Sequence, residues 1–431
     1  MSRVLTLAAV LAVAACGRLG FDFAGGGGSS TSPDATGVPD DTGVLAAACP
    51  EKPMTSGIMV KTGTELVNAI ASASPGDTIL LADGLYSTAS TISIDTPNLT
   101  IRSASNHSDG PVVDGLGLAN PLFYVRAKNV SFISLTMRNT KQDAVFVEPL
   151  DAAGDATGVR IYDVTFTDVR GPAVRAKSYM SLATTPFADD GEVACSRVGH
   201  TVDSDCGPDG VFGVRLQGAR NWTIRDTYFS GRCSPSRTRA VWADAGARDV
   251  TVTNNVFANN RNNILFGGIA LRTYPDALPA GCSGTPHLWG GLVCNNRIGG
   301  LGVSSSTGND FEEGIALWTT CDTWVLHNTV VSPAGAETYE NIEYRFAGTY
   351  VHLVNNLLSV DPLLRDSGQL DPASTNTLYT SPSDFVDAAA GDLRISTSAT
   401  IASGVAISQC LTDANGKPRN TASPTPGAFE R

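Results

Sequence analysis

Hydrophobic and polar positions alternate along most of this chain with the two-residue period of a β-strand, and the alternating segments recur. Each segment has two apolar residues two positions apart, then Ser, Asp or Asn, and a further apolar residue three positions later. The segments are Leu99–Ser103, Val130–Met137, Val159–Phe166, Trp222–Phe229, Val250–Phe257, Val293–Ile298, Trp324–Val331 and Val351–Leu358. Their spacing is about 28 residues, with one repeat obscured and insertions in others, which is typical of a solenoid.

A second series of strands advances with the first at the same period. Its members are Val145–Val147, Val174–Ala176, Val214–Leu216, Val241–Ala243, Ile269–Leu271, Ile315–Leu317 and Ile342–Tyr344. Two series that advance together describe a coil in which each turn hydrogen-bonds to the next, about 4.8 Å away. The sequence therefore predicts an all-β protein, a single-stranded parallel β-helix.

The Ser, Asp or Asn of each repeat has the same parity as the apolar pair before it, so its side chain is expected inside the coil at a bend. Amides stacked on successive turns can hydrogen-bond to one another along the axis. We therefore expect a structural asparagine ladder formed by Asn254, Asn295, Asn328 and Asn355.

One short helix is expected before the coil. Thr62–Glu65 has the spacing of a capping box, and Leu66, Val67 and Ile70 follow on one helical stripe. This pattern predicts an amphipathic helix near residues 63–73.

The segment Leu66–Tyr86, with its turns Pro75–Thr78 and Asp83–Tyr86, resembles the amino-terminal signature of the chondroitinase B and alginate lyase group. That group lies within the pectin-lyase-like superfamily, so the resemblance implies a right-handed parallel β-helix whose open end is capped by the helix. The tail, with Gly391–Arg394 and Asp413–Arg419, is similar to the closing segment of bacterial surface β-helix proteins. The lyases' catalytic lysine and arginine motif does not map onto this sequence, so the resemblance implies no catalytic residues.

The first residues predict export from the cytoplasm. The apolar run Val4–Ala15 is too short to span a bilayer and indicates a signal peptide over residues 1–15. The boundary Val13–Cys16 resembles a bacterial lipobox, which implies a lipid anchor at Cys16 and, with Gly17 next, the outer membrane or cell surface. The alternative is an ordinary secretory signal followed by a free cysteine.

The rest of the chain divides by composition. Residues 16–48 are rich in Gly, Ser and Pro and predict a flexible tether. The coil, with its capping helix, is expected over residues 49–385, and a closing segment over residues 386–431.

The cysteines after Cys16 number eight, which predicts up to four disulfides in an oxidising compartment. Cys195 and Cys206 bracket a short Gly- and Asp-rich excursion, so we expect them to pair. A zinc site is the competing interpretation, but no Cys-x-x-Cys spacing supports it.

With 30 basic and 42 acidic residues, the chain carries a net charge of −12, which argues against a nucleic-acid partner. Candidate chemistry lies instead on the outward residues of the second strand series, which stack into two columns. One column reads Arg175, Arg215, Trp242, Ala270, Ala316 and Glu343, and the other reads Lys177, Gln217, Asp244, Arg272, Trp318 and Arg345.

Indole faces stack on sugar rings, and guanidinium groups grip uronate carboxylates, so this mixture suits a polysaccharide partner. Trp242, Trp318, Asp244 and Glu343 are the expected substrate-binding residues. The alternative is a solvated face with ordinary cross-strand ion pairs.

Elimination at a uronate needs a cation to neutralise the carboxylate and a base to remove the neighbouring proton. The eligible groups are Lys177, Arg215, Arg272 and Arg345. The leading functional hypothesis is thus a polysaccharide lyase that acts on uronate-containing glycans, and the alternative is a non-catalytic carbohydrate-binding or structural surface protein.

Glu313 and Glu340 each lie two residues before the first apolar position of their strands, so they should stack on neighbouring turns. Two carboxylates at that distance share a proton or bind a cation, and with Asp310 they are candidate calcium ligands. Two separately solvated turn acids are the alternative. His327 and His352 are expected at the surface.

Overall fold

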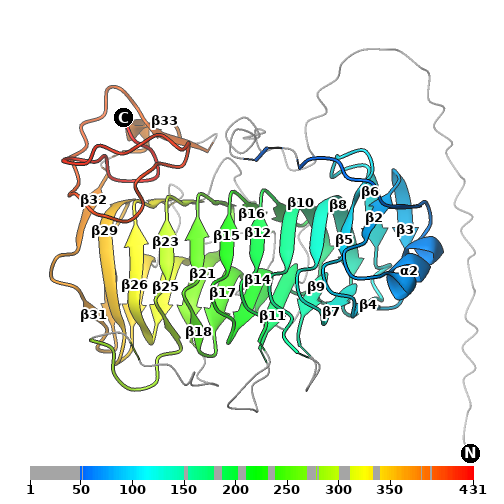
Figure 1. Ribbon diagram of the computed structural model, residues 1–431. Coiled ribbons are helices and arrows are strands. Elements are labelled where there is room, and N and C mark those ends of the chain that lie inside the picture. The colour runs from blue at the N-terminus through cyan, green and yellow to red at the C-terminus, as the bar shows by residue number, and fades with distance from the viewer. Residues whose placement is uncertain are drawn as a thin grey trace, which may run out of the picture. The chain divides into compact units, whose positions relative to one another are not determined.

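The computed structural model confirms the predicted fold class, a right-handed parallel β-helix with one short N-terminal helix (Figure 1). Among the described residues, no helix is long and apolar enough to cross a membrane. The predicted signal peptide, the predicted tether and Cys16 lie outside the described residues. The structure describes residues 49–50, 52–149, 154–178, 187–201, 210–231, 238–268, 278, 281–299, 311–332, 340–379, 381–388 and 391–431.

Sheet B contains ten parallel strands, one for each turn of the coil that it crosses. In chain order they are β4 (Ile92–Ile94), β7 (Phe123–Val125), β9 (Val145–Val147), β11 (Val174–Lys177), β14 (Val211–Gln217), β17 (Arg239–Asp244), β21 (Asn262–Gly267), β25 (Glu313–Trp318), β28 (Glu340–Arg345) and β30 (Leu363–Arg365).

Sheet A contains 22 strands and bends along its length, so that most turns contribute two strands to it. In chain order they are β1 (Ile58–Val60), β2 (Thr78–Leu81), β3 (Gly84–Ser87), β5 (Thr100–Ser103), β6 (Pro111–Asp114), β8 (Ser131–Thr140), β10 (Arg160–Val169), β12 (Glu192–Ala194), β13 (Arg197–Gly199), β15 (Thr223–Arg225), β16 (Tyr228–Ser230), β18 (Ala247–Arg248), β19 (Thr251–Thr253), β20 (Val256–Ala258), β22 (Leu288–Trp289), β23 (Leu292–Cys294), β24 (Arg297–Gly299), β26 (Thr320–Leu326), β27 (Thr329–Val331), β29 (Tyr350–Leu358), β31 (Gln369–Leu370) and β32 (Thr375–Leu378).

Helix α2 (Gly63–Ser72) lies at the blue end of the coil in Figure 1. Thr62 caps it by accepting a hydrogen bond from the Glu65 backbone N–H, as the sequence predicts. Its buried residues Leu66 and Ile70 join the apolar core that runs through the coil. The helix therefore covers apolar surface that the first turn would otherwise expose.

A residue in the left-handed backbone conformation stands at the bend of sheet A on each turn from β8 to β29, with φ between 49° and 59°. Short polar side chains tolerate this conformation, which explains the recurring Ser, Asp or Asn. The obscured repeat is β12 and β13, with Cys195 at its bend. The bend residues are Ser134, Asp163, Cys195, Asp226, Asn254, Asn295, His327 and Asn355.

The asparagine ladder exists, but its main series runs one residue later than predicted on most turns. Of the predicted residues, Asn328 belongs to that series, and Asn295 Nδ2 donates to Asn254 Oδ1 at 3.2 Å beside it. Each left-handed residue interrupts the alternation, so the next residue carries the buried, axially bonded amide. The Nδ2 groups donate to the next Oδ1 at 2.8–3.0 Å along the series Asn255, Asn296, Asn328, Asn356 and Asn376.

The turn that contains Asn328 is also one residue out of the predicted register. Val325 pairs with Val293 and Leu353 and is fully buried, whereas Trp324 faces outward. Because of that shift, His327 takes the bend position and is fully buried, and burial lowers its pKa to about 3. His352 is 7% exposed and contacts Asp371, so the prediction of two surface histidines is wrong.

Three disulfides are formed by described cysteines: Cys49–Cys195, Cys282–Cys321 and Cys294–Cys410. The predicted Cys195–Cys206 pair is wrong, because Cys195 is bonded to a cysteine 146 residues earlier in the chain. Cys206 lies outside the described residues. Local spacing failed here because stacking brings a cysteine from a distant part of the chain into bonding distance of Cys195.

The C-terminal segment closes over the bend of sheet A. It begins with a 3-10 turn (Pro382–Asp384) and the antiparallel pair β33 (Phe385–Asp387) and β34 (Asp392–Ile395). Arg419, further along, is buried and donates to the Oδ1 of Asn295 at 2.7 Å.

Candidate functional site

The outward residues of sheet B form the two predicted columns on every turn but one. Register pairs Arg175 with Arg215 and Trp242, and further along the sheet pairs Trp318 with Arg345. The Ile269–Leu271 strand is wrong, because β21 (Asn262–Gly267) supplies that turn. Leu265 and Gly267 stand where Ala270 and Arg272 were expected, and Arg272 lies outside the described residues.

The reason for this error is visible in the sequence. Ile264 and Phe266 form an apolar pair of the same kind as Ile269 and Leu271, only five residues earlier, and both are buried in the coil. The insertion therefore follows the strand rather than preceding it, which alternation alone does not reveal.

Two indole rings lie close to the backbone of this turn at Gly268, which adopts φ 107°. A Cβ at Gly268 would stand 3.5 Å from atoms of both the Trp242 and the Trp318 rings. The Arg239 guanidinium carbon lies 5.7 Å from the Trp242 ring centre and 5.1 Å from that of Trp318. Two tryptophans from turns that are not adjacent thus meet around one arginine that the sequence analysis did not identify.

Three glutamates lie beside the tryptophans. Glu313 is paired in register with Glu340, as predicted, and Glu343 joins them so that carboxylate oxygens of all three lie within 4.8 Å of one another. Arg239 donates to Glu313 and Trp318 Nε1 donates to Glu343, both at 2.8 Å. We call Trp242, Arg239, Trp318, Glu313, Glu340 and Glu343 the tryptophan–carboxylate cluster.

All three carboxylates are buried, and burial decides their electrostatics. Desolvation raises the pKa of Glu340 to about 7, and repulsion from Glu343 and Glu313 acts in the same direction. Burial also raises the pKa of Glu313, although the Arg239 guanidinium opposes the shift. The cluster therefore contains a carboxyl group that can gain or lose a proton near neutral pH.

A second buried pair stands on the neighbouring turns. Arg215 is 5% exposed and Asp244 is fully buried, and they form an ion pair at 2.8 Å. The Arg215 guanidinium also stacks 3.4 Å from the Trp242 ring centre. Burial raises the pKa of Asp244 to about 7 although Arg215 opposes the shift. Because both side chains are buried and paired, Asp244 is a structural partner of the arginine.

Each described residue that the sequence offers as a lyase base is paired with a carboxylate. Lys177 contacts Glu148 at 2.8 Å, Arg215 contacts Asp244, and Arg345 contacts Asp366 at 2.5 Å. A carboxylate partner stabilises the protonated form of a basic group. These groups are therefore arranged as cations rather than as proton acceptors.

The three glutamates fit a calcium ion by donor type and spacing. Calcium takes carboxylate oxygens at 2.3–2.6 Å, and oxygens up to 4.8 Å apart can share one ion. The buried Oε2 of Glu340 has no hydrogen-bond partner in the described part of the chain. Arg239 and Arg365, which lies 3.0 Å from Glu343, balance two of the three charges. Asp310, the third predicted ligand, lies outside the described residues.

No protein-family model matches the chain, and no curated protein matches its sequence. Among solved structures, the chain is similar to pectate lyase Pel9A, with a TM-score of 0.44 and 15% identity over 91% of this chain and 100% of that one. It is similar to an alginate lyase from Paenibacillus sp. str. FPU-7, with a TM-score of 0.39 and 16% identity over 74% and 97%.

A third structure is the tailspike protein of E. coli bacteriophage HK620 in complex with a pentasaccharide, with a TM-score of 0.46 and 13% identity over 78% of this chain and 64% of that one. At these identities the likenesses concern the fold alone. The strand pairing described above establishes that fold from the chain itself.

Proposed function

We propose that the outer face of sheet B binds a polysaccharide that contains acidic sugars. The observation that carries the proposal is the meeting of Trp242 and Trp318 around Arg239, next to three buried carboxylates. Indole rings contact sugar rings and guanidinium groups contact carboxylates, while the buried Glu313 and Glu343 hold Arg239 and Trp318 in place by accepting their hydrogen bonds.

Calcium is the proposed cofactor, held by Glu313, Glu340 and Glu343. When bound, it supplies positive charge that a uronate carboxylate can share. Calcium should raise the thermal unfolding midpoint of the protein, and Glu340→Gln should remove that response. If calcium leaves the unfolding midpoint of the parent protein unchanged, the calcium proposal is contradicted. The polysaccharide proposal does not depend on that result.

A bound polysaccharide is either cleaved by elimination or held without reaction. The ion pairs of Lys177, Arg215 and Arg345 favour non-catalytic binding, since none of these groups is arranged as a base. The pKa of Glu340 near 7 favours proton transfer, because a general base works best near the working pH. We infer that binding is the primary function and that a lyase reaction is its catalytic candidate.

The test is binding to pectate, alginate and glycosaminoglycans, with parallel measurement of the absorbance of the unsaturated elimination product. Trp318→Ala and Trp242→Ala should each weaken binding about tenfold. Trp324→Ala is the matched control, because Trp324 is also a half-exposed tryptophan but lies on sheet A, stacked on His352. Binding that survives the paired sheet B substitutions contradicts the proposed surface, and absence of absorbance with every glycan contradicts the lyase reaction.

The proposal includes the cellular location of the protein. Three formed disulfides support an oxidising compartment. We infer that the chain is exported and anchored by lipid at Cys16 on the outer membrane or cell surface. Incorporation of labelled palmitate that Cys16→Ser abolishes would support this inference, and incorporation that persists would contradict it.

A further inference from the structure

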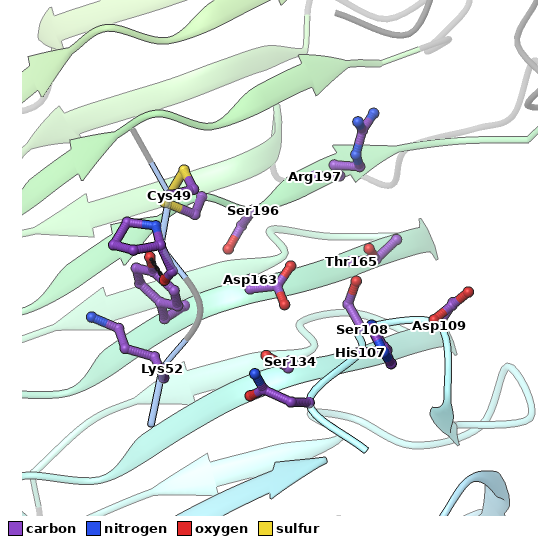
Figure 2. A pocket seen from close by; sticks show the side chains of 14 residues that line it. Cys49, Lys52, His107, Ser108, Asp109, Ser134, Asp163, Thr165, Ser196 and Arg197 are labelled. Carbon is purple, nitrogen blue, oxygen red and sulfur yellow. Dashed lines mark hydrogen bonds between the residues drawn. A yellow bond between two sulfur atoms is a disulfide. The ribbon is translucent and has the colours of Figure 1, made fainter. Parts of the chain in front are cut away.

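A cleft of about 510 Å³ lies beside sheet A (Figure 2). None of its lining residues belongs to the tryptophan–carboxylate cluster. This volume is typical of small-molecule sites. Three parts of the chain line it: the segment that precedes β1, the loop between β5 and β6, and the bend positions of β8, β10 and β12–β13.

One wall of the cleft is residues 49–54, which we call the strap; residue 51 lies outside the described residues. The Cys49–Cys195 disulfide ties its beginning to the bend of sheet A. Tyr162 donates its hydroxyl to the Pro50 carbonyl at 2.7 Å, and buried Arg102 donates to the Pro53 carbonyl at 2.6 Å. The strap is thus fixed at three points, and the cleft is a built feature of the fold.

Asp163 occupies the middle of the cleft, with the hydroxyl groups of Ser134, Ser108 and Ser196 around it (Figure 2). Ser134 and Ser108 hydrogen-bond to its carboxyl group, and burial raises its pKa despite those bonds. Its side chain is half-buried, so part of the carboxyl group remains accessible from the cleft.

Basic side chains stand on opposite sides of Asp163. The Lys52 ammonium lies over the Tyr162 ring, 3.8 Å from its centre, and Arg197 lies on the other side in Figure 2. With Asp109 and Asp163, the lining contains two acidic and two basic groups besides His107. A strongly charged ligand of either sign is therefore poorly matched.

We propose that this cleft binds a single sugar unit that carries one acidic group. The ring hydroxyls would hydrogen-bond to Asp163 and its serine neighbours, and the acid would pair with Lys52 or Arg197. Serine and carboxylate oxygens exchange hydrogen bonds readily with vicinal hydroxyls, while the cations discriminate between acidic and neutral sugars. The site is independent of the surface proposed on sheet B.

The experiment is calorimetric titration of the full protein with galacturonate, galactose and acetate at low ionic strength. Galacturonate should bind at least tenfold more tightly than galactose, which lacks the acid, or acetate, which lacks the ring. Lys52→Gln and Asp163→Asn should each weaken galacturonate binding about tenfold. Trp318→Ala should leave it unchanged, which separates this site from the polysaccharide surface.

Asp163→Asn is chosen because asparagine tolerates the left-handed backbone that Asp163 adopts at φ 54°. Asp190→Asn is the matched control, since Asp190 is exposed, has φ 58° and lies outside the cleft lining. Equal affinity for acetate and galacturonate would show a simple anion site and overturn the proposal. Undetectable galacturonate binding at millimolar concentration, or binding unchanged in both cleft variants, would overturn it as well.

Discussion

The charged groups on the outer face of sheet B are mostly buried and paired within the coil, whereas those of the cleft beside the strap stand around an open space. Arg215 and Asp244 neutralise each other, and Arg239 is bonded to Glu313. In the cleft, Lys52 rests on an aromatic ring and Asp163 accepts hydrogen bonds from hydroxyls. A column of residues read from a solenoid sequence shows which side chains are neighbours. Whether a ligand can reach those side chains depends on their pairing and on the segments that lie over that face.

Removing the Cys49–Cys195 disulfide should have the largest effect and would show whether the cleft depends on the strap. The bond closes a loop of 146 residues, so the double variant Cys49→Ser, Cys195→Ser should lose about 5 kcal/mol of unfolding free energy. Urea unfolding measures this loss. Galacturonate binding should also fall, while polysaccharide binding to sheet B should persist. Loss of polysaccharide binding with galacturonate binding unchanged would contradict the dependence of the cleft on the strap.

Breaking the Arg215–Asp244 pair tests whether sheet B is held by its internal ion pairs. Arg215→Met removes the partner of a fully buried carboxyl group and should cost about 3 kcal/mol, because Asp244 must then either stay charged without compensation or take up a proton. Thermal unfolding of the single variant Arg215→Met and of the double variant Arg215→Met, Asp244→Leu measures this loss of stability. The double variant should recover much of the loss, and a double variant as unstable as the single one would contradict this account.

Titration of Glu340 gives a smaller and pH-dependent effect. Its carboxyl group has a pKa of about 7 in the folded protein, above the usual value of 4.5, so the folded state holds a proton that the unfolded chain has released. Unfolding free energy should therefore be highest below about pH 4 and fall as pH rises toward 7. Glu340→Gln should remove this dependence and stabilise the protein by about 2 kcal/mol at pH 8.

Urea unfolding of the parent protein and of Glu340→Gln at pH 5 and pH 8, without calcium, measures that difference. Glu148→Gln is a control, because Glu148 is partly exposed and, among the described residues, its carboxylate contacts the Lys177 ammonium and the Tyr124 hydroxyl but no other carboxylate. It should give no gain at pH 8. If the unfolding free energy changes equally between pH 5 and pH 8 in the parent protein and in Glu340→Gln, the glutamates are better solvated than their burial indicates.

The sequence predicts the coil well because two patterns can be read locally: the repeat length of about 28 residues and the alternation of inward and outward side chains. Stacking of the turns preserves both patterns. Glu313 and Glu340 were correctly placed on neighbouring turns for this reason. The asparagine ladder was displaced because left-handed bend residues break parity, and Arg272 was misplaced because an equivalent apolar pair lies five residues earlier. No periodic signal marks the strap, whose contacts with Tyr162 and Cys195 span more than a hundred residues.

The position of the Cys49–Cys195 bond also sets how the coil would respond to a mechanical pull on the segment before residue 49. Such a force would enter the flank of the coil at Cys195 instead of its first turn. Helix α2 and strand β1 follow Cys49 in the chain and would carry little of the load. Turns at the open end would thus be shielded from peeling, and rupture would require shearing strands in the middle of a stack that supports them on both sides.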